Sequence, residues 1–185
     1  MRIVGGSHRG RRLAAPKGRE TRPTSDRARE GVFNILAHSQ DADFEDLFVI
    51  DLFAGSGAMG IEALSRGAAE ALFVENSRAA RAVIDENVNT LGLRDQTAVE
   101  AWDATRLPVR RDRYPPAGLV FLDPPYGKGL IPPALNSLIS GAWLAETATI
   151  VAETGSEEDL AFPPAFSQMS ERAYGDAFFR FLTLA

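Results

Sequence analysis

Four short segments of the chain are almost continuously apolar, and this feature restricts the fold more than any other. The segments span residues 48–53, 71–75, 118–123 and 148–153. A strand with one face in water alternates apolar and polar residues, whereas a strand of a parallel sheet is buried on both faces and reads as a continuous apolar run. The four segments therefore predict a parallel sheet that is covered on both faces.

Between these segments the apolar residues follow the period of an α-helix. At the start of the first helix, Thr24 or Ser25 can cap the free amides, and Asp26 suits the positive end of the dipole. Its buried stripe consists of Ala28, Val32, Ile35 and Leu36. Further helices over 59–66, 79–91 and 132–139, a short strand over 98–101, and a hairpin from 166–172 and 178–184 complete the pattern. This alternation predicts an α/β fold, a doubly wound, Rossmann-like sheet that is mostly parallel, with helices on both faces and an antiparallel C-terminal hairpin.

The residue types that are missing exclude several kinds of site. The 185-residue chain has no cysteine and only two histidines, His8 and His38. This excludes a disulfide scaffold and a thiolate metal site, and leaves little for a Ser-His-Asp triad. The acids sit singly at strand ends, so we expect no metal site. We also expect a cytoplasmic protein with no membrane segment, because the sequence has neither a signal peptide core nor a long apolar span.

The positive charge is concentrated at the N-terminus. Residues 1–29 hold nine Lys or Arg and two acids, a net +7, whereas the whole chain carries −5, so the remaining residues carry −12. A basic segment on an acidic body is typical of a protein that binds phosphates with that segment. The alternative is a solvated tail, or a segment whose arginines pair with acids of the body.

Apolar residues within the basic segment favour folded structure. Ile3 and Val4, and then Leu13 and Ala14, flank a glycine-containing stretch as in a hairpin. We therefore divide the chain into a basic N-terminal hairpin extension, residues 1–20, and a main domain, residues 21–185. The candidate phosphate-binding residues are Arg9, Arg11, Arg12, Arg22 and Arg27.

A glycine pattern follows the first predicted strand. Gly55, Gly57 and Gly60 form the sequence Gly-x-Gly-x-x-Gly between a strand and a helix, where glycine lets the backbone approach a ligand closely. Glu75 ends the next strand, 20 residues after Gly55, at the position from which a carboxylate accepts the ribose hydroxyls of an adenosine. The pattern predicts a nucleoside-binding site that fits NAD, FAD and S-adenosylmethionine equally well.

A second motif follows the strand at 118–123. In Asp123-Pro124-Pro125-Tyr126 the prolines remove backbone donors, which leaves the Asp123 carboxylate and the Pro124 carbonyl as acceptors. Tyr126 adds a flat face on which a planar base can stack. Together they suit the exocyclic amino group of a nucleobase that has left its stack. In isolation, the tetrapeptide is also compatible with a rigid turn capped by an acid.

These motifs carry a family resemblance. Residues 51–60 together with Asp123–Tyr126 resemble the class I S-adenosylmethionine-dependent methyltransferases that act on amino nitrogens. The segments 2–6, 9–11, 16–18 and 21–36 are similar to the N-terminal signature of the RsmD family, the 16S ribosomal RNA guanine-N2 methyltransferases. This second resemblance covers essentially the whole chain.

The resemblance implies a role for each matching residue. The cofactor S-adenosylmethionine would contact Asp51, Phe53, Gly55, Gly57, Gly60, Glu75, Asn76, Asp103 and Ala104. Asp103, expected at the end of the third strand, would accept from the adenine amino group. Asp123, Pro124, Pro125 and Tyr126 would hold the target base, and Arg9, Arg11, Arg12, Arg22 and Arg27 would contact RNA.

The implied reaction is methylation of the exocyclic N2 of one guanine in 16S rRNA, within the small ribosomal subunit or an assembly intermediate. It would proceed by base flipping and in-line methyl transfer. The residues leave other targets open, namely adenine N6 in DNA or RNA and a protein glutamine amide. A catalytically silent nucleic-acid-binding module and a nicotinamide reductase are the alternatives from other classes.

Overall fold

The computed structural model describes residues 1–15, 25–39, 44–155 and 161–185. Its elements are α1 (Asp26–Ser39), β1 (Phe48–Leu52), α2 (Ala58–Ser65), β2 (Glu70–Val74), α3 (Arg78–Leu91), η1 (Arg94–Gln96), β3 (Thr97–Glu100), β4 (Ala117–Leu122), α4 (Ile131–Ser140), β5 (Leu144–Gly155), β6 (Phe166–Tyr174) and β7 (Ala177–Leu184). Within the described residues, no helix is both long and apolar enough to cross a membrane.

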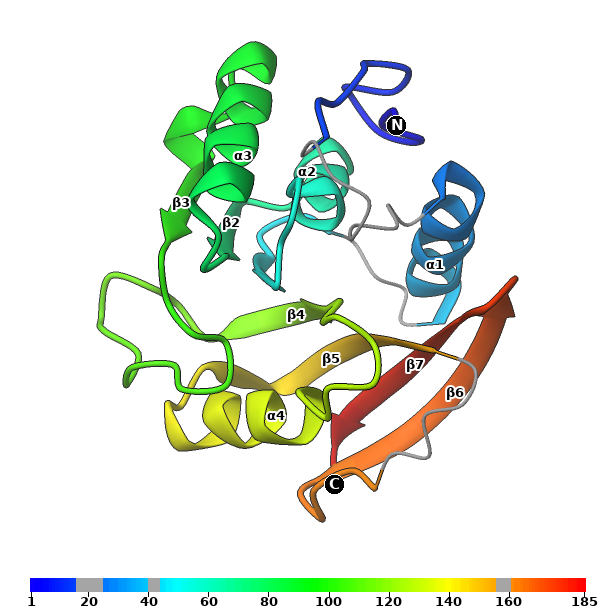
Figure 1. Ribbon diagram of the computed structural model, residues 1–185, viewed down its shortest axis with the longest axis vertical. Coiled ribbons are helices and arrows are strands. Elements are labelled where there is room, and N and C mark those ends of the chain that lie inside the picture. The colour runs from blue at the N-terminus through cyan, green and yellow to red at the C-terminus, as the bar shows by residue number, and fades with distance from the viewer. Residues whose placement is uncertain (16–24, 40–43, 156–160) are drawn as a thin grey trace.

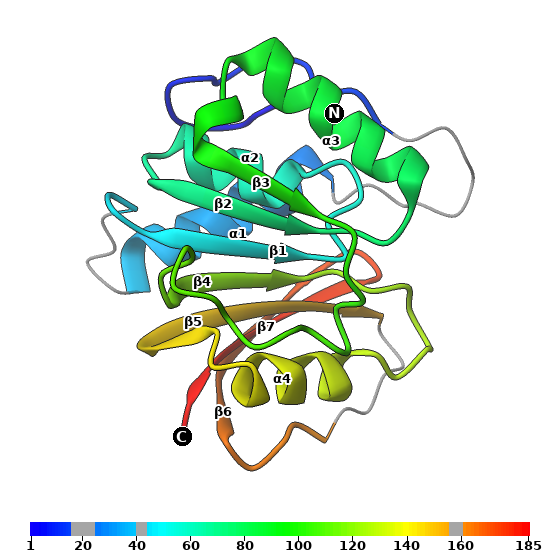
Figure 2. The same ribbon diagram turned by 90° about the vertical axis from the view of Figure 1, so that its left-hand side faces the viewer.

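The strands form one seven-stranded sheet in the order β3-β2-β1-β4-β5-β7-β6 (Figures 1 and 2). Strands β1 to β5 are parallel, and β7 is antiparallel to both β5 and β6. The predicted α/β sheet with an antiparallel C-terminal hairpin is therefore confirmed. Strand β5 is longer than the predicted 148–153, because its first residue pairs with Ala117 and its last with Ala177.

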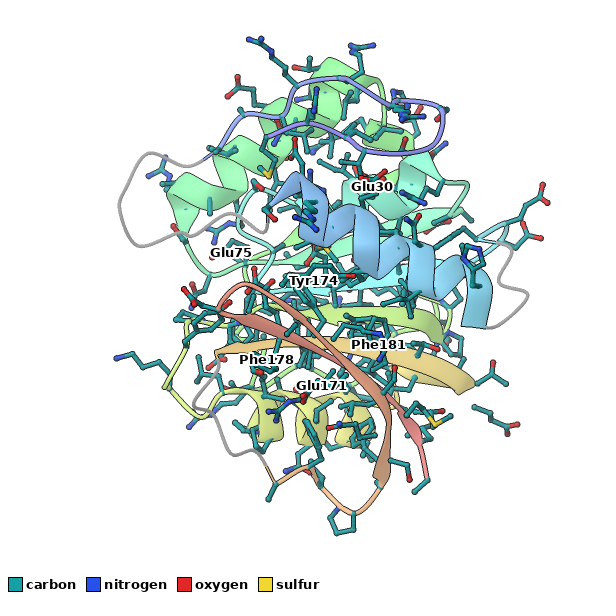
Figure 3. The ribbon with its side chains drawn as sticks, turned by 90° about the vertical axis from the view of Figure 1, so that its right-hand side faces the viewer. Glu30, Glu75, Glu171, Tyr174, Phe178 and Phe181 are labelled. Carbon is teal, nitrogen blue, oxygen red and sulfur yellow. The ribbon has the colours of Figure 1, made fainter. Side chains whose placement is uncertain are left out.

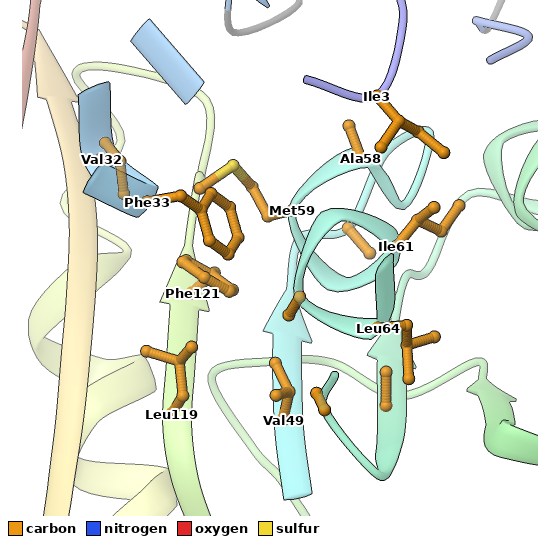
Figure 4. Close-up of a cluster of buried hydrophobic side chains, with 14 of the residues drawn as sticks. Ile3, Val32, Phe33, Val49, Ala58, Met59, Ile61, Leu64, Leu119 and Phe121 are labelled. Carbon is orange, nitrogen blue, oxygen red and sulfur yellow. The ribbon is translucent and has the colours of Figure 1, made fainter. Parts of the chain in front are cut away.

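The two faces of the sheet have separate apolar cores. On one face, side chains such as Val49 and Phe121 pack against α1 and α2 (Figure 4). Phe73 and α3 belong to the same core. On the other face, Ile50 and its neighbours pack against α4 and the segment 101–116. This explains the apolar runs, because consecutive residues of a strand point to opposite faces and both faces are covered.

Residues 1–15, the first described part of the basic segment, form a folded hairpin. Arg2 and Arg12 form an antiparallel bridge, and the Ile3 amide donates to the Arg11 carbonyl at 2.9 Å. Ile3 is 1% exposed and Leu13 is 6% exposed, and both belong to the core that contains α1 and α2. These residues are therefore not a solvated tail. We call residues 1–15 the N-terminal hairpin.

Helix α1 joins the N-terminal hairpin to the sheet. Ser25 Oγ accepts from the Ala28 amide at 3.1 Å, which confirms the predicted cap, whereas Thr24 lies outside the described residues. At Gly31 a Cβ atom would lie 2.0 Å from the Tyr174 hydroxyl. The glycine therefore lets α1 approach the end of β6 (Figure 3).

A buried carboxylate holds these parts together. Glu62 in α2 is 0% exposed and its Oε2 accepts from the Val4 amide at 2.9 Å. Its Oε1 accepts from Arg66 Nε at 2.9 Å. Arg29, also 0% exposed, lies with Nε 3.7 Å from Glu62 Oε2. The carboxylate thus contacts the N-terminal hairpin, α1 and the end of α2 together.

Arg29 belongs to the basic segment but points into the protein. Its Nη2 donates to Asp26 Oδ1 at 2.8 Å and to the Arg2 carbonyl. Arg2 itself pairs with Asp26 Oδ2 at 3.2 Å. Part of the positive charge of the basic segment therefore pairs with acids of the protein itself.

We predict that Glu62→Ala destabilises the protein by about 3–5 kcal/mol, because it removes a buried acidic neighbour of the buried Arg29 guanidinium. Urea unfolding followed by circular dichroism measures the change. The control is Glu70→Ala, which removes an exposed acid and should leave the unfolding midpoint unchanged. Equal midpoints for the two variants would contradict the structural role given to Glu62.

Candidate active site

The strands β1, β2 and β4 end at the same level of the sheet. Leu52 pairs with Val74 on one side and with Leu122 on the other, and these are the last residues of their strands. The residues that follow, Phe53, Glu75 and Asp123, therefore leave the sheet at one edge. Ligands of such sheets bind beyond this carboxyl edge, so the two predicted motifs share one site.

Asp51 lies beneath the glycine turn rather than on its surface. It is 1% exposed, and its Oδ2 accepts from the Gly60 amide at 2.9 Å. Burial raises the pKa of Asp51, the hydrogen bond from Gly60 opposes this, and the negative charge of Glu75 adds to it, so that the pKa is about 7. Asp51 thus fixes the start of α2 from below.

The three glycines of the motif do different things. Gly57 has φ +77, and a Cβ atom there would lie 3.1 Å from the Phe73 ring. At Gly60 a Cβ atom would lie 2.5 Å from the same ring, so these two glycines let α2 pack closely on β2. Gly55 has φ +55, and its Cβ atom would meet only the Phe53 carbonyl, at 3.9 Å. Only Gly55 therefore faces space that a ligand can enter.

Phe53 connects β1 to this turn in a strained conformation. Its φ is +58, a left-handed value that residues with a Cβ atom rarely adopt. Such strain persists where the surrounding structure enforces it, and it is frequent at functional sites. The next residue, Ala54, donates its amide to the Val74 carbonyl at 3.2 Å, which holds the turn against β2.

Glu75 faces the glycine turn from the end of β2 (Figure 3). Its Oε2 accepts from the Gly55 amide at 2.9 Å, and its Oε1 accepts from the Ser77 amide at 2.7 Å. Each carboxylate oxygen has a second lone pair, so both can still accept a ribose hydroxyl. Asn76 is exposed, and its carbonyl accepts from Arg81 Nη1 at 2.7 Å.

Asp103 does not end the third strand, because β3 ends at Glu100. Asp103 lies in the following turn, where its Oδ1 accepts from Thr105 Oγ1 at 2.7 Å and from the Thr105 amide at 2.9 Å. These two hydrogen bonds lower the pKa of Asp103. Ala104 is 4% exposed, and its carbonyl accepts from Ser137 Oγ at 2.7 Å, which ties this turn to α4.

The Asp123–Tyr126 motif leaves β4 beside the glycine turn. The Asp123 amide donates to the Leu52 carbonyl at 3.4 Å, which places the motif next to the end of β1. Pro124 is buried, whereas Pro125 and Tyr126 are exposed. The Tyr126 hydroxyl donates to Glu153 Oε1 at 2.6 Å. Sequence reasoning missed Glu153, although it lies near the carboxyl end of β5 and the strand-end rule applied to it.

Two of the predicted RNA-binding arginines lie away from this edge. Arg9 is in the tip of the N-terminal hairpin, which contacts the end of α2 through Ser65, and Arg11 Nη2 donates to the carbonyl of Thr90 near the end of α3 at 3.3 Å. Because both helices begin at the carboxyl edge, their ends lie at the opposite edge. Arg12 is exposed on the hairpin and Arg27 in the first turn of α1, and Arg22 is outside the described residues.

A buried asparagine ties the N-terminal hairpin to the glycine turn. Asn87 in α3 is 3% exposed, and its Oδ1 accepts from the Ala14 amide at 2.8 Å. Its Nδ2 donates to the Ala14 carbonyl at 3.1 Å and to the Ser56 carbonyl at 3.0 Å. Nothing in the sequence around Asn87 signals this role, because both partners are backbone groups from other segments.

The arrangement at this edge suits a nucleoside. Glu75 supplies acceptors, Gly55 leaves room for close approach, and Tyr126 supplies an aromatic face. In the described part of the chain, no three His, Cys, Asp or Glu side chains converge in a way that could hold a metal ion.

The raised pKa of Asp51 predicts a pH dependence of stability. The Asp51 carboxyl binds its proton more tightly in the folded state than in the unfolded state. The stability that this proton gives is complete below the ordinary pKa of 3.8 and is lost as the pH rises to about 7. Asp51→Asn keeps an acceptor for Gly60 and removes the titration. The unfolding free energy of the native protein should fall relative to that of the variant, with a limiting slope of about 1.4 kcal/mol per pH unit.

Urea unfolding of both proteins between about pH 4 and pH 7 measures this difference. Asp103→Asn is the control. Because the pKa of Asp103 is lowered from 3.8, its contribution is complete above that value and is lost only below it, so the difference between the native protein and Asp103→Asn should stay constant over this range. A constant difference between the native protein and Asp51→Asn over this range would contradict the raised pKa.

Known proteins are similar to this chain in sequence and in structure. The family model described as "Conserved hypothetical protein 95" matches residues 1–183. The chain is 38% identical over 181 residues to "Ribosomal RNA small subunit methyltransferase D" of Escherichia coli (strain K12), which covers 97% of this chain and 88% of that protein. It is also 38% identical over 161 residues to "Putative rRNA methyltransferase YlbH" of Bacillus subtilis (strain 168), with 86% and 85% covered.

Solved structures agree with these sequence matches. The structure described as "Putative methyltransferase yhhF from Escherichia coli" superposes with a TM-score of 0.82 at 36% identity and covers 100% of this chain and 97% of that chain. A ribosomal protein L11 methylase from Lactobacillus delbrueckii subsp. bulgaricus, at 16% identity and a TM-score of 0.60, shares the fold. The chain therefore belongs to the RsmD family of methyltransferases and has their class I fold.

Proposed function

We propose that this protein uses S-adenosylmethionine to methylate the exocyclic N2 of a specific guanine in 16S rRNA, within the small ribosomal subunit or an assembly intermediate. The observation that carries the proposal is the shared carboxyl edge, where Glu75 and Gly55 lie next to the Asp123–Tyr126 motif. The relatives named as ribosomal RNA small subunit methyltransferases supply the substrate class.

The cofactor is assigned to the β1–β3 side of the edge. Glu75 accepts the ribose hydroxyls with its remaining lone pairs while it holds the Gly55 amide. Asp103 accepts the adenine amino group, and Asp51 supports the turn from below. When bound, S-adenosylmethionine supplies a methyl group on a sulfonium, which is already a good leaving group, so the protein mainly has to position the reactants.

The target base is assigned to the Asp123–Tyr126 motif. A guanine that leaves its stack lies on the Tyr126 ring, and its amino group donates to the Asp123 carboxylate and the Pro124 carbonyl. These two acceptors orient the nitrogen lone pair toward the methyl group. Asp123 is also the candidate acceptor for the proton that the nitrogen loses.

The decisive experiment incubates the pure protein with methyl-labelled S-adenosylmethionine and undermethylated small ribosomal subunits, naked 16S rRNA, DNA or protein fractions. Nuclease digestion and mass spectrometry then identify the labelled nucleoside. Label on guanine N2 of 16S rRNA supports the proposal. Label on adenine N6 or on a protein amide supports those other targets, and tight RNA binding without any label supports a silent binding module.

Two single substitutions separate cofactor binding from turnover. Glu75→Ala should weaken S-adenosylmethionine binding by about 1–3 kcal/mol, the usual cost of leaving buried partners unpaired. Asp123→Ala should abolish methyl transfer while calorimetry finds nearly native cofactor affinity, because Asp123 acts on the nucleophile. Unchanged affinity in Glu75→Ala, or near-normal turnover in Asp123→Ala, would each show that the residue has been given the wrong role.

RNA docking is assigned to the exposed arginines of the N-terminal hairpin. Replacing Arg9, Arg11 and Arg12 by Ala should raise the apparent KM for ribosomal particles and flatten the salt dependence of binding, because fewer counterions are released. Cofactor affinity should not change.

A variant of equal charge provides the control. Arg94, Arg111 and Arg113 are exposed, and Arg94 and Arg113 line a cleft of about 310 Å³ beside β3. Replacing these three arginines by Ala should change the salt dependence of binding to ribosomal particles less than the hairpin variant does. If this control flattens the slope and the hairpin variant does not, RNA docks along β3 instead.

A further inference from the structure

Glu153 is a buried acid that the proposed reaction does not use. It is 6% exposed and lies in β5, where it pairs with Phe179 of β7. Carboxylates are rarely buried to this extent unless they are paired. One of its partners is the Tyr126 hydroxyl, 2.6 Å from Glu153 Oε1, within the range of a short, charge-assisted hydrogen bond.

The Tyr126 ring is held at a second point by Gly155. A Cβ atom at Gly155 would lie 3.3 Å from Tyr126 Cδ2 and 3.5 Å from its Cγ. The glycine therefore lets the ring lie directly against the backbone of β5. Glu153 and Gly155 are two residues apart in one strand, so they lie on the same side of the sheet. Glu153 contacts the Tyr126 hydroxyl, and Gly155 contacts the Tyr126 ring.

Tyr126 needs such support because it lies in a loop. It follows two prolines and precedes Gly127 and Gly129, both of which have positive φ values, +69 and +61. The side chain is 36% exposed, so it is not fixed by burial. Strand β5 lies between β4 and β7 in the sheet and is therefore a firm support.

The register places this support beside the target-base motif. Leu122 of β4 pairs with Ala152 of β5, so Asp123 and Glu153 are the next residues along two neighbouring strands. The hydrogen bond from Tyr126 to Glu153 is therefore made on the strand next to β4, at the level of Asp123.

We propose that Glu153 is a positioning residue for the target base: it fixes the Tyr126 ring, against Gly155, in the orientation in which the base stacks. This inference rests on the proposed function of Tyr126, through which Glu153 would act. It also explains why the hydroxyl matters, because Tyr126→Phe keeps the stacking ring but removes the donor to a buried carboxylate.

The test compares Glu153→Ala, Glu153→Gln, Tyr126→Phe and the double variant Tyr126→Phe/Glu153→Ala. With the labelled substrate, Glu153→Ala and Tyr126→Phe should each lower kcat/KM for RNA roughly tenfold, as expected for one lost hydrogen bond to a charged group. Cofactor affinity should stay native. The double variant should be no worse than either single variant, because all three lose the same bond. Glu153→Gln, which still accepts from the hydroxyl, should recover most of the rate.

Two further variants guard against an unspecific loss of structure. Gly155→Ala leaves Glu153 intact but displaces the Tyr126 ring, and should lower kcat/KM for RNA. Glu146→Ala removes an exposed acid near the other end of β5 and should have no effect. Additive losses in the double variant, or equal losses in Glu153→Gln and Glu153→Ala, would overturn the inference.

Hydrogen exchange of the 123–130 segment keeps this result separate from the proposed function. Glu153→Ala and Tyr126→Phe should both speed exchange in this segment, whether or not the protein methylates RNA. Faster exchange with unchanged kcat/KM would overturn the positioning role, as would native exchange in both variants. A native protein that labels no nucleic acid would instead contradict the proposed function.

Discussion

The arrangement of the molecule depends on one buried carboxylate. Glu62 is 0% exposed, and the cost of burying its charge is offset by hydrogen bonds from the Val4 amide and Arg66 and by the charge of Arg29, whose Nε lies 3.7 Å away. These contacts fix the N-terminal hairpin and α1 onto α2. Because α2 starts at the glycine turn, the N-terminal hairpin and the glycine turn belong to one packed unit. Asn87 strengthens the same link by bonding Ala14 and Ser56.

The site itself combines firm support with local strain. Phe53 is held at φ +58 between β1 and the glycine turn, and Asp51 is buried beneath it with a raised pKa. Both features cost stability, and the packing of α2 on Phe73, which Gly57 and Gly60 permit, supports them. The Asp123–Tyr126 loop also has a contact with regular structure, because the Tyr126 hydroxyl donates to Glu153 in β5.

Some positive side chains of the basic segment pair with acids of the protein, and others are exposed at the surface. Arg29 is buried and cannot contact a phosphate, whereas Arg2 is exposed and pairs with Asp26 at the surface. Arg9, Arg11 and Arg12 remain exposed on the N-terminal hairpin.

The sequence by itself determined the strands, the helices and the two motifs at the strand ends, because apolar periodicity and glycine or proline positions are local properties of the chain. It placed Asp103 wrongly at a strand end, and it treated three glycines with different roles alike. Only the tertiary structure assigned Glu62, Asn87 and Glu153, whose partners lie 58, 73 and 27 residues away in the chain. Their roles depend on backbone amides, carbonyls and a hydroxyl that other segments bring to them. Local spacing carries no information about such contacts, because they exist only once the sheet has set the register of β4 with β5 and the helices have packed on its faces.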